Sequence, residues 1–452
     1  MTTADASSTR GFTPKGHATR DRILRAAADV LLQGGLSTFS LDKVRQAASV
    51  SGSQLDHYFH DRQDLIRSVV ARQIDGVLDF HRQPKLGGLD TFEEWEAWAD
   101  LNVRYLRRIG YRGTTTYHVL AGQLAKSDDD MRRTFADGYG RWVNLLEDSF
   151  HRMRSSGALV KSADPRRLAW TVVALHQGAG VLAFTYRRDW PLVEVTRAVV
   201  NYVRLFARDP EERAPRRARR SRPRPRVARP SSSPEAPFTR KGLATRARIV
   251  EGAAELFLER GVTGTSLDDV RQSVGVSGSQ ISHYFADKRD LVRQVIAARA
   301  AFVVDFHRQP QLNGLDDLSS LRRWADLCWA QAGDNYLRNG CVFGSLSGEL
   351  LESDDDVLDD LAAGYDEWLA LFRAGLSAMA GRGELTSEVD PDHLAVALVA
   401  AHQGGTLLTH ITGSAEPFTA AVDAVLEYVA SFTPSSTRGS APATPRRSSA
   451  LR

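Results

Sequence analysis

The chain repeats itself at an offset of 226 residues, which constrains its fold more than any other feature. Residues 40–59 read SLDKVRQAASVSGSQLDHYF, and residues 266–285 read SLDDVRQSVGVSGSQISHYF. The match continues downstream, where the run DFHRQP at 79–84 recurs at 305–310. A repeat this long indicates a duplicated protein rather than a short solenoid unit. Each copy, at about 200 residues, is long enough to bury a core of its own.

Positive charge is concentrated between the two copies. The net charge of the chain is +4, but residues 208–229 hold ten arginines and three acidic residues and so contribute +7. The rest of the chain is therefore close to −3. A block of like charge suits a polyanion such as nucleic acid, and it equally suits a solubilising linker. Both interpretations stay open.

Cysteine usage and hydropathy exclude several classes of protein. The cysteines are Cys328 and Cys341 alone, too few for a disulfide framework or a cysteine metal cluster, so we expect no metal and no cofactor. No apolar run approaches the ~18 residues of a membrane span. The N-terminal MTTADASSTRGF has no apolar signal core. We therefore expect a reducing cytoplasm and no membrane partner.

Helical periodicity runs through both copies without a convincing alternating strand pattern, which predicts an all-α fold. The first helix should run from Pro14 to about Gln33, where Gly34-Gly35 should end it. Ser40 and Ser51 should cap two short helices joined by a tight turn. This helix-turn-helix layout is the one that enters a DNA major groove.

The repeat and the linker together predict a domain order. We expect two tandem units, each with an N-terminal helix-turn-helix domain and a longer C-terminal helical domain. The expected segments are a disordered N-terminus at 1–14, a DNA-binding domain at 15–77, a regulatory domain at 78–208, an Arg/Pro-rich linker at 209–237, a second DNA-binding domain at 238–303, a second regulatory domain at 304–432 and a disordered tail at 433–452.

Further shared residues surround each motif: Ala18-Thr19-Arg20, Ile23-Leu24, Ser40-Leu41, Val50–Ser53 and His57-Tyr58-Phe59, and then Ala244-Thr245-Arg246, Ile249, Ser266-Leu267, Val276–Ser279 and His283–Phe285. In these positions both copies resemble the TetR family of bacterial transcriptional regulators. The resemblance implies an all-α fold, an N-terminal DNA-binding domain and a C-terminal domain for ligand binding and dimerisation. It also implies a repressor that a small molecule releases from DNA.

The start of the second helix in such a motif meets base edges, and flanking groups hold phosphates. Gln54 and Gln280 can donate and accept together, which matches adenine. Arg62 and Lys288 add positive charge at a helix N-terminus. Core packing is the alternative for Tyr58. The candidate DNA-binding residues are Ser40, Ser51, Gly52, Ser53, Gln54, His57, Tyr58 and Arg62, and Ser266, Ser277, Gly278, Ser279, Gln280, His283, Tyr284 and Lys288.

The two motifs differ where DNA recognition is expected. Asp56 occupies the place of Ser282, and a carboxylate close to phosphate is repulsive. Phe39 occupies the place of Thr265. We therefore expect the two copies to recognise unequal half-sites.

The copies can fold onto each other as a pseudo-dimer within one chain. A linker of 28 residues, 210–237, spans about 30 Å when flexible, and half-sites lie about 34–36 Å apart. The candidate interface is Leu168–Leu182 against Leu394–Leu408, although ordinary core packing explains part of both segments. A homodimer of fused chains is the other assembly. The arginines of 221–226 also suit a narrow minor groove.

A small hydrophobic or aromatic ligand is the second expected partner, after a double-stranded DNA operator. Aromatics at helical spacing also fill ordinary cores, so core packing is the alternative. Gly113-Thr114-Thr115 replaces the Gly340-Cys341 motif, which predicts a lost or altered ligand site in the first copy. The candidate ligand-binding residues are Trp98, Tyr117, Trp142, His176, Trp324, Phe343, Trp368 and His402.

An enzyme is not expected, because no nucleophile elbow, phosphate loop or metal-binding motif appears. The repeated SDDD at 127–130 and 353–356 needs only a serine cap followed by first-turn acids. The other function is a ligand-insensitive architectural DNA-binding protein that uses the basic linker. Either function places the protein at the bacterial nucleoid.

Overall fold

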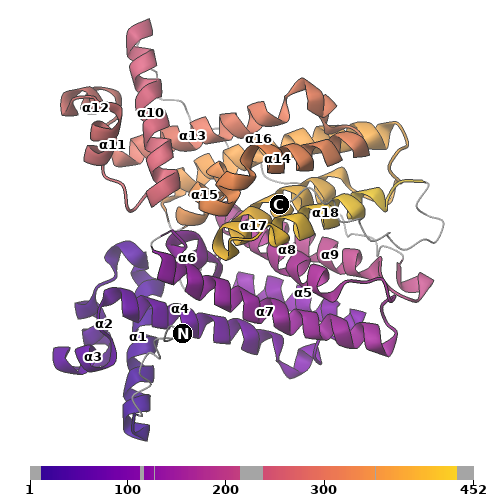
Figure 1. Ribbon diagram of the computed structural model, residues 1–452, viewed down its shortest axis with the longest axis horizontal. Helices are drawn as coiled ribbons and strands as arrows, with labels where there is room; N and C mark the ends of the chain where they lie inside the picture. The colour runs from indigo at the N-terminus through magenta and orange to yellow at the C-terminus, as the bar shows by residue number, and fades with distance from the viewer. Residues whose placement is uncertain (1–11, 112–116, 127, 214–237, 352, 435–452) are drawn as a thin grey trace, which may run out of the picture.

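The structure is a computed structural model that describes residues 12–111, 117–126, 128–213, 238–351 and 353–434 (Figure 1). In these ranges every regular element is a helix, and an isolated bridge joins Leu159 to Ala207. The all-α expectation is confirmed.

Helices at equivalent positions follow one another in the same order in both copies. The first copy contains α1 (Pro14–Thr38), α2 (Leu41–Ala48), α3 (Gly52–Tyr58), α4 (Arg62–His81), η1 (Pro84–Leu86), α5 (Phe92–Arg108), α6 (Tyr117–Leu124), α7 (Asp129–Ser156), α8 (Pro165–Tyr186), α9 (Trp190–Arg204) and η2 (Pro210–Arg213). The second contains α10 (Arg240–Arg260), α11 (Leu267–Val274), α12 (Gly278–Tyr284), α13 (Lys288–His307), η3 (Pro310–Leu315), α14 (Leu318–Asn339), α15 (Val342–Glu349), α16 (Asp355–Gly381), α17 (Pro391–Thr412) and α18 (Glu416–Ala430).

Two helix boundaries differ from the expectation. Helix α1 does not end at Gly34-Gly35 but continues to Thr38, whereas α10 ends at Arg260 as the glycine after it predicts. Asp128 caps α7 by accepting the N–H of Met131 at 2.6 Å, and in the second copy Asp354, rather than Ser353, caps α16. The carboxylate is the stronger acceptor for an N-terminal N–H, because it also interacts favourably with the helix dipole.

The long apolar helices α8 and α17 cross at a pair of equivalent glycines. A Cβ on Gly178 would lie 1.9 Å from the carbonyl oxygen of Ala400, and a Cβ on Gly404 would lie 1.7 Å from that of Ala174. Both distances are far below van der Waals contact, so only glycine permits this approach. Gly178 and Gly404 are equivalent positions, and so are Ala174 and Ala400. Because the two contacts are equivalent, the two copies meet about a quasi-twofold axis.

A second pair of helices crosses in the same symmetric manner. Helices α6 and α15 meet at Gly122 and Gly348, where a Cβ on Gly122 would lie 2.6 Å from the carbonyl oxygen of Gly348. Helices α9 and α18 flank the α8–α17 crossing and also contact each other. The contact between copies therefore extends from the first crossing to the second.

Polar side chains border this contact, and they differ between its two sides. Arg167 on α8 pairs with Glu427 on α18 at 2.7 Å, and Tyr202 donates to the same carboxylate at 2.8 Å. Across the quasi-twofold axis, His393 lies 2.9 Å from the carboxylate of Glu194 and 3.1 Å from the hydroxyl of Tyr428.

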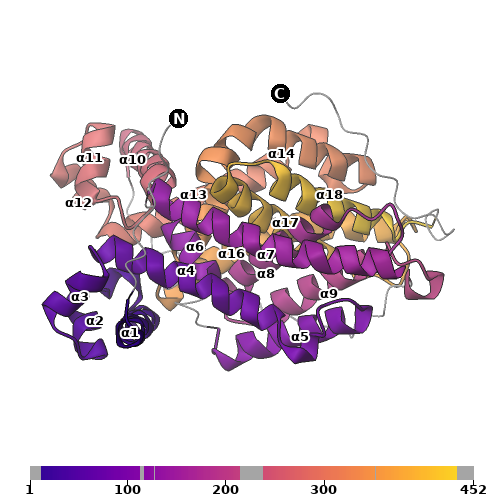
Figure 2. The same cartoon turned by 60° about the horizontal axis from the view of Figure 1, so that its bottom comes forward.

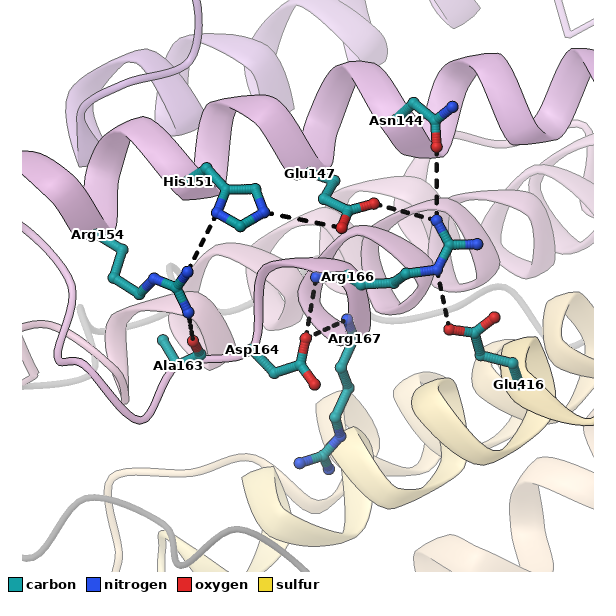
Figure 3. Close-up of polar contacts among 9 residues, drawn as sticks. All are labelled: Asn144, Glu147, His151, Arg154, Ala163, Asp164, Arg166, Arg167 and Glu416. Carbon is teal, nitrogen blue, oxygen red and sulfur yellow. Dashed lines mark hydrogen bonds and ion pairs between the residues drawn. The ribbon is translucent and has the colours of Figure 1, made fainter.

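Arg166, one residue earlier on α8, bridges the two copies (Figure 3). Its guanidinium lies 3.1 Å from Glu147 on α7 and 3.2 Å from Glu416 on α18. Asp164 holds the start of α8 in place by accepting the N–H groups of Arg166 and Arg167 at 3.1 and 3.2 Å. An aspartate N-cap followed by proline at the first helical position is a typical helix start.

Helices α8 and α17 are long and apolar enough to cross a membrane, so the expectation that no apolar run approaches a membrane span is wrong. Their most apolar windows are 100% and 94% buried inside the fold. Because helices that are apolar on all sides are typical of a large protein core, these two are explained by the contact that they form.

The two short-helix pairs lie at one end of the molecule. In Figure 1, α2 and α3 lie at the lower left and α11 and α12 at the upper left, and the view in Figure 2 keeps both pairs on that side. The quasi-twofold contact therefore directs both motifs toward one end of the molecule.

Candidate nucleic-acid interface and internal cavities

The first motif is a pair of short helices anchored by a few buried side chains. Val44 of α2 and Leu55 of α3 are buried, and Ser49 turns the chain between the helices with a φ of 50°. Gly275 makes the same turn in the second copy with a φ of 64°. The outward face of α3 is polar, and its N-terminal residues 51–54 are all exposed.

Ser51 and Gln54 cap the start of α3 reciprocally. The Ser51 hydroxyl accepts the Gln54 N–H at 3.1 Å, and the Gln54 side-chain oxygen accepts the Ser51 N–H at 3.0 Å. Ser277 and Gln280 repeat this capping box at 3.2 and 2.9 Å. The glutamine oxygen is thus already engaged, and the expected two-sided contact with adenine is not preformed.

Most of the candidate DNA-binding residues lie on the exposed surface of the motifs. A Cβ on Gly52 or Gly278 would meet nothing within 4 Å, so another backbone has room to approach there. Ser40 caps α2, and Ser266 caps α11. The exposed candidates are Ser51, Gly52, Ser53, Gln54 and His57, and Ser266, Ser277, Gly278, Ser279, Gln280 and His283.

The tyrosine of each motif is half-buried against an aromatic residue that precedes the first helix. Tyr58 packs on Phe12 with ring centroids 5.1 Å apart, and Tyr284 packs on Phe238 at 5.2 Å. Phe59 is 3% exposed and lies in the core. The tyrosines therefore link the segment before the first helix of each copy to α3 and α12.

Arg62 and Lys288 face the interior of the motif as well as its surface. The Arg62 guanidinium donates to the carbonyl oxygen of Phe39 at 3.3 Å and stands over the Phe39 ring. Partial burial lowers the pKa of Lys288, although the carboxylate of Asp269 opposes that shift. The ammonium group of Lys288 therefore gives up its proton more readily than that of an exposed lysine.

The exchange of Phe39 for Thr265 lies beneath the surface of the motifs. Phe39 is 5% exposed and Thr265 is 1% exposed, and the Thr265 hydroxyl donates to the carbonyl of Gly261 at 2.9 Å. This difference changes packing. Asp56 and Ser282, in contrast, are both exposed, so the surfaces of the two motifs differ in charge at that position.

A cavity of about 460 Å³ opens between α4, α5 and α8 of the first copy. Of the candidate ligand-binding residues, Tyr117, Trp142 and His176 line this cavity, together with Tyr105 and Phe80. Trp98 lies outside the lining and is fully buried. The lining is mainly apolar, which suits a hydrophobic or aromatic molecule.

The second copy has a smaller cavity of about 280 Å³ at the equivalent place. Trp368 and His402 line it, whereas Trp324 and Phe343 lie in the core. Tyr336 and His402 form a hydrogen bond of 3.0 Å at its wall. The cavity of the first copy is thus larger than that of the second.

A buried histidine that sequence reasoning did not single out organises each cavity. His81 donates from Nδ1 to the carbonyl of Val77 at 2.7 Å, and its Nε2 accepts the indole N–H groups of Trp98 and Trp142 at 3.0 and 3.2 Å. Burial lowers the pKa of His81 to about 4. The histidine is therefore neutral and acts as an acceptor for two tryptophans.

His307 repeats this arrangement in the second copy. Trp324 and Trp368 each donate to its Nε2 at 2.9 Å, and burial lowers its pKa to about 4. The repeated DFHRQP run was the sequence signal for both histidines. Their partners come from helices distant in sequence, which the run itself does not reveal.

Several predictions concern residues outside the described part of the chain. These are Gly113-Thr114-Thr115, the arginines of 221–226, Ser127, and most of the N-terminal, linker and C-terminal segments. Cys328 and Cys341 are described, and both are free and buried.

Three family models match the chain. "Bacterial regulatory proteins, tetR family" matches residues 249–295, "Tetracyclin repressor-like, C-terminal domain" matches 318–425, and "Transcriptional regulator LmrA/YxaF-like, C-terminal domain" matches 92–198. The first match runs from within α10 to within α13, and the other two cover most of the helical segments downstream in each copy.

Two curated regulators resemble one copy each in length. Transcriptional regulator AcuR of Cereibacter sphaeroides is 26% identical over 189 residues, which cover 41% of this chain and 82% of AcuR. HTH-type transcriptional repressor DhaR of Mycobacterium sp. strain GP1 is 27% identical over 184 residues, covering 40% of this chain and 90% of DhaR. The crystal structure of regulatory protein TetR from Rhodobacter sphaeroides aligns with a TM-score of 0.38 at 22% identity, covering 40% of this chain and 97% of that one. The chain belongs to the TetR family of DNA-binding transcriptional regulators, with two family copies fused in tandem.

Proposed function

We propose that the chain is a repressor that binds one operator as a covalent pseudo-dimer. Helices α3 and α12 would enter successive major grooves, which requires recognition helices about 34–36 Å apart. The observation that carries the proposal is the quasi-twofold crossing of α8 and α17 at Gly178 and Gly404. A contact of this kind in a homodimer would join two chains, and here it joins two halves of one.

Fusion changes how such a dimer assembles. A linker of 28 residues keeps the partner at an effective concentration of roughly millimolar, so dimerisation no longer depends on protein concentration. The DNA-binding domains in this proposal are 15–77 and 238–303, and the regulatory domains are 78–208 and 304–432. We place the protein in the bacterial cytoplasm, at the nucleoid.

Ser53 and Ser279, with the amide nitrogens of Gln54 and Gln280, are proposed to meet base edges. The residues proposed to hold phosphates or to admit the backbone are Ser40, Ser51, Gly52, His57, Tyr58 and Arg62, and Ser266, Ser277, Gly278, His283, Tyr284 and Lys288. Asp56 opposite Ser282 would make the half-sites unequal, because a carboxylate repels phosphate.

A small hydrophobic or aromatic molecule is proposed to release the operator. It would enter the cavity beside Tyr117, Trp142 and His176, or the one beside Trp368 and His402. Binding there can favour release only if the molecule binds the DNA-free arrangement more tightly than the DNA-bound one.

Genome-wide footprinting with the purified chain, followed by mass measurement of the complex, tests the proposal. We expect one chain on one pseudo-palindromic site, at every protein concentration tried. Two chains on a longer site would overturn the pseudo-dimer and favour a homodimer of fused chains.

Salt dependence separates a repressor from an architectural DNA-binding protein that uses the basic linker. A repressor retains sequence preference as salt rises, whereas an architectural protein shows little preference and a steep salt slope. Equal affinity for the footprinted site and for random DNA would therefore favour the architectural function.

A further inference from the structure

A buried ion pair joins the two copies close to their DNA-binding units. Lys126, just after α6 of the first copy, lies 3.2 Å from the carboxylate of Glu349, the last residue of α15 in the second. The side chains are only 9% and 8% exposed. The Lys126 ammonium also donates to the hydroxyl of Ser345. Charged side chains are rarely buried to this degree unless they form an ion pair and further hydrogen bonds.

The same carboxylate holds the DNA-binding unit of the second copy. Its other oxygen accepts the backbone N–H of Val262 at 2.7 Å, just after the glycine that ends α10. Gly261 has a φ of 78°, and a Cβ there would lie 2.9 Å from that oxygen. In a continuing helix the Val262 N–H would bond to the carbonyl four residues earlier. Glu349 therefore takes the N–H that would extend α10.

The equivalent place in the first copy cannot form this link. Gln123 occupies the position of Glu349, and Glu352 occupies that of Lys126, so no cation is present. The side-chain oxygen of Gln123 is buried without a hydrogen-bond partner among the described residues. There α1 runs to Thr38, four residues past the position at which α10 ends. The two DNA-binding units are thus attached differently.

Helix α6 connects this ion pair to a cavity. The helix begins at Tyr117, which lines the first-copy cavity, and ends at Leu124, two residues before Lys126. Its crossing with α15 at Gly122 and Gly348 leaves no room for an intervening side chain. A movement of α6 at the cavity therefore reaches Lys126 along eight residues of helix.

We propose that the first copy controls the DNA-binding unit of the second copy through Lys126 and Glu349, while the unit of the first copy lacks this control. The inference rests on the proposed function only in that the unit binds DNA. It makes the two half-sites unequal in regulation, beyond any difference in the bases they prefer.

Removal of the cation should free the end of α10. Burial already raises the pKa of Glu349, and the ammonium of Lys126 opposes that shift. Without Lys126, the carboxyl group would take up a proton and become a weaker acceptor for the Val262 N–H. The link to α10 should then loosen, whereas α1 should not respond.

Amide hydrogen exchange on the full chain without DNA tests the link itself. We expect Lys126→Met to speed exchange in residues 258–267 by roughly tenfold or more, with residues 32–41 unchanged. Glu349→Gln added to that variant should restore slow exchange, because a neutral amide oxygen accepts the N–H without needing a cation. Lys161→Met, at an exposed lysine of the same copy, is the matched control. Equal changes in both segments, or none in either, would overturn the inference.

Footprinting of the same variants on the operator separates this inference from the proposed function. We expect Lys126→Met to lose protection on the half-site bound by α12 and to keep it on the half-site bound by α3. If the unmodified chain protects no operator, the proposed function fails while the exchange result still decides the link. If Lys126→Met weakens both half-sites equally, the link is refuted and the repressor remains.

Discussion

At the scale of single residues, the side-chain amide of Gln54 caps α3 and is also proposed to contact a base edge. Its oxygen caps α3, so only its nitrogen can donate to a base edge in the DNA-free structure. Gln280 is held in the same way. A base contact that requires the oxygen must first break the cap, which typically contributes about 1 kcal/mol to helix stability. The proposed contact of these residues with bases therefore competes with helix capping.

Substitution of Gln54 by glutamate separates the two uses. The carboxylate of Gln54→Glu can still accept the Ser51 N–H and suits a helix N-terminus, so thermal stability should not fall. The variant loses the N–H donor and adds a charge next to phosphate, so operator affinity should fall at least about tenfold. Gln54→Ala should lose both stability and affinity. Unchanged affinity in the glutamate variant would exclude a base contact by this side chain.

The buried histidines predict how stability depends on pH. His81 and His307 have pKa values lowered from 6.5 to about 4, because burial disfavours the charged form. The unfolded chain therefore binds more protons below pH 6.5, and stability is lost as pH falls from 6.5 toward 4. Each histidine should contribute a slope of about 1.4 kcal/mol per pH unit in that window.

Urea unfolding between pH 4.5 and 7.5 measures this slope. His81→Gln should be less stable at pH 7.5 than the unmodified chain, since two indole N–H groups lose their acceptor geometry. The free energy of unfolding of this variant should also fall less steeply as pH falls, because its unfolding takes up about one proton fewer. Parallel curves for the two proteins would mean that His81 titrates normally in the fold.

At the scale of elements, the crossing of α8 and α17 has little tolerance for added volume. Gly178→Ala should destabilise the chain by about 1–3 kcal/mol, because the new methyl group would meet the carbonyl oxygen of Ala400. Gly140→Ala on α7 is the matched control, since a Cβ there meets nothing within 4 Å. That variant should be neutral or up to about 1 kcal/mol more stable. Chemical unfolding of both proteins measures the difference, and equal effects would contradict the close crossing.

Local sequence predicts an element well when its signal and its partner are neighbours. Ser51 and Gln54 are three residues apart, so the cap of α3 could be predicted from the sequence. The end of α1 could not be predicted, because the helix continues through Gly34-Gly35 to Thr38. In the second copy α10 ends four positions earlier, where Glu349, distant in sequence, accepts the Val262 N–H. The role of His81 was missed for the same reason, since its two tryptophans lie on α5 and α7.

At the scale of the whole molecule, the linker should be needed to keep the two copies together only at low protein concentration. A protease site placed within residues 214–237 would allow the linker to be cut after folding. The two halves should stay together at micromolar concentration through the α8–α17 contact, and operator binding by the cut protein should become concentration-dependent. Gel filtration and operator titration at nanomolar protein measure both effects. Unchanged binding by the cut protein at high dilution would show that the linker adds nothing to assembly.

The quasi-twofold contact also has an evolutionary consequence. In an ordinary homodimer every inherited substitution appears on both sides of the axis, so a change must be compatible with its own image. In this chain each position can mutate alone. Arg167 now faces Glu427, while its equivalent His393 faces Glu194, a pairing that no single gene encoding a symmetric dimer could specify. Duplication within one chain has released the two faces of the axis from having to remain identical.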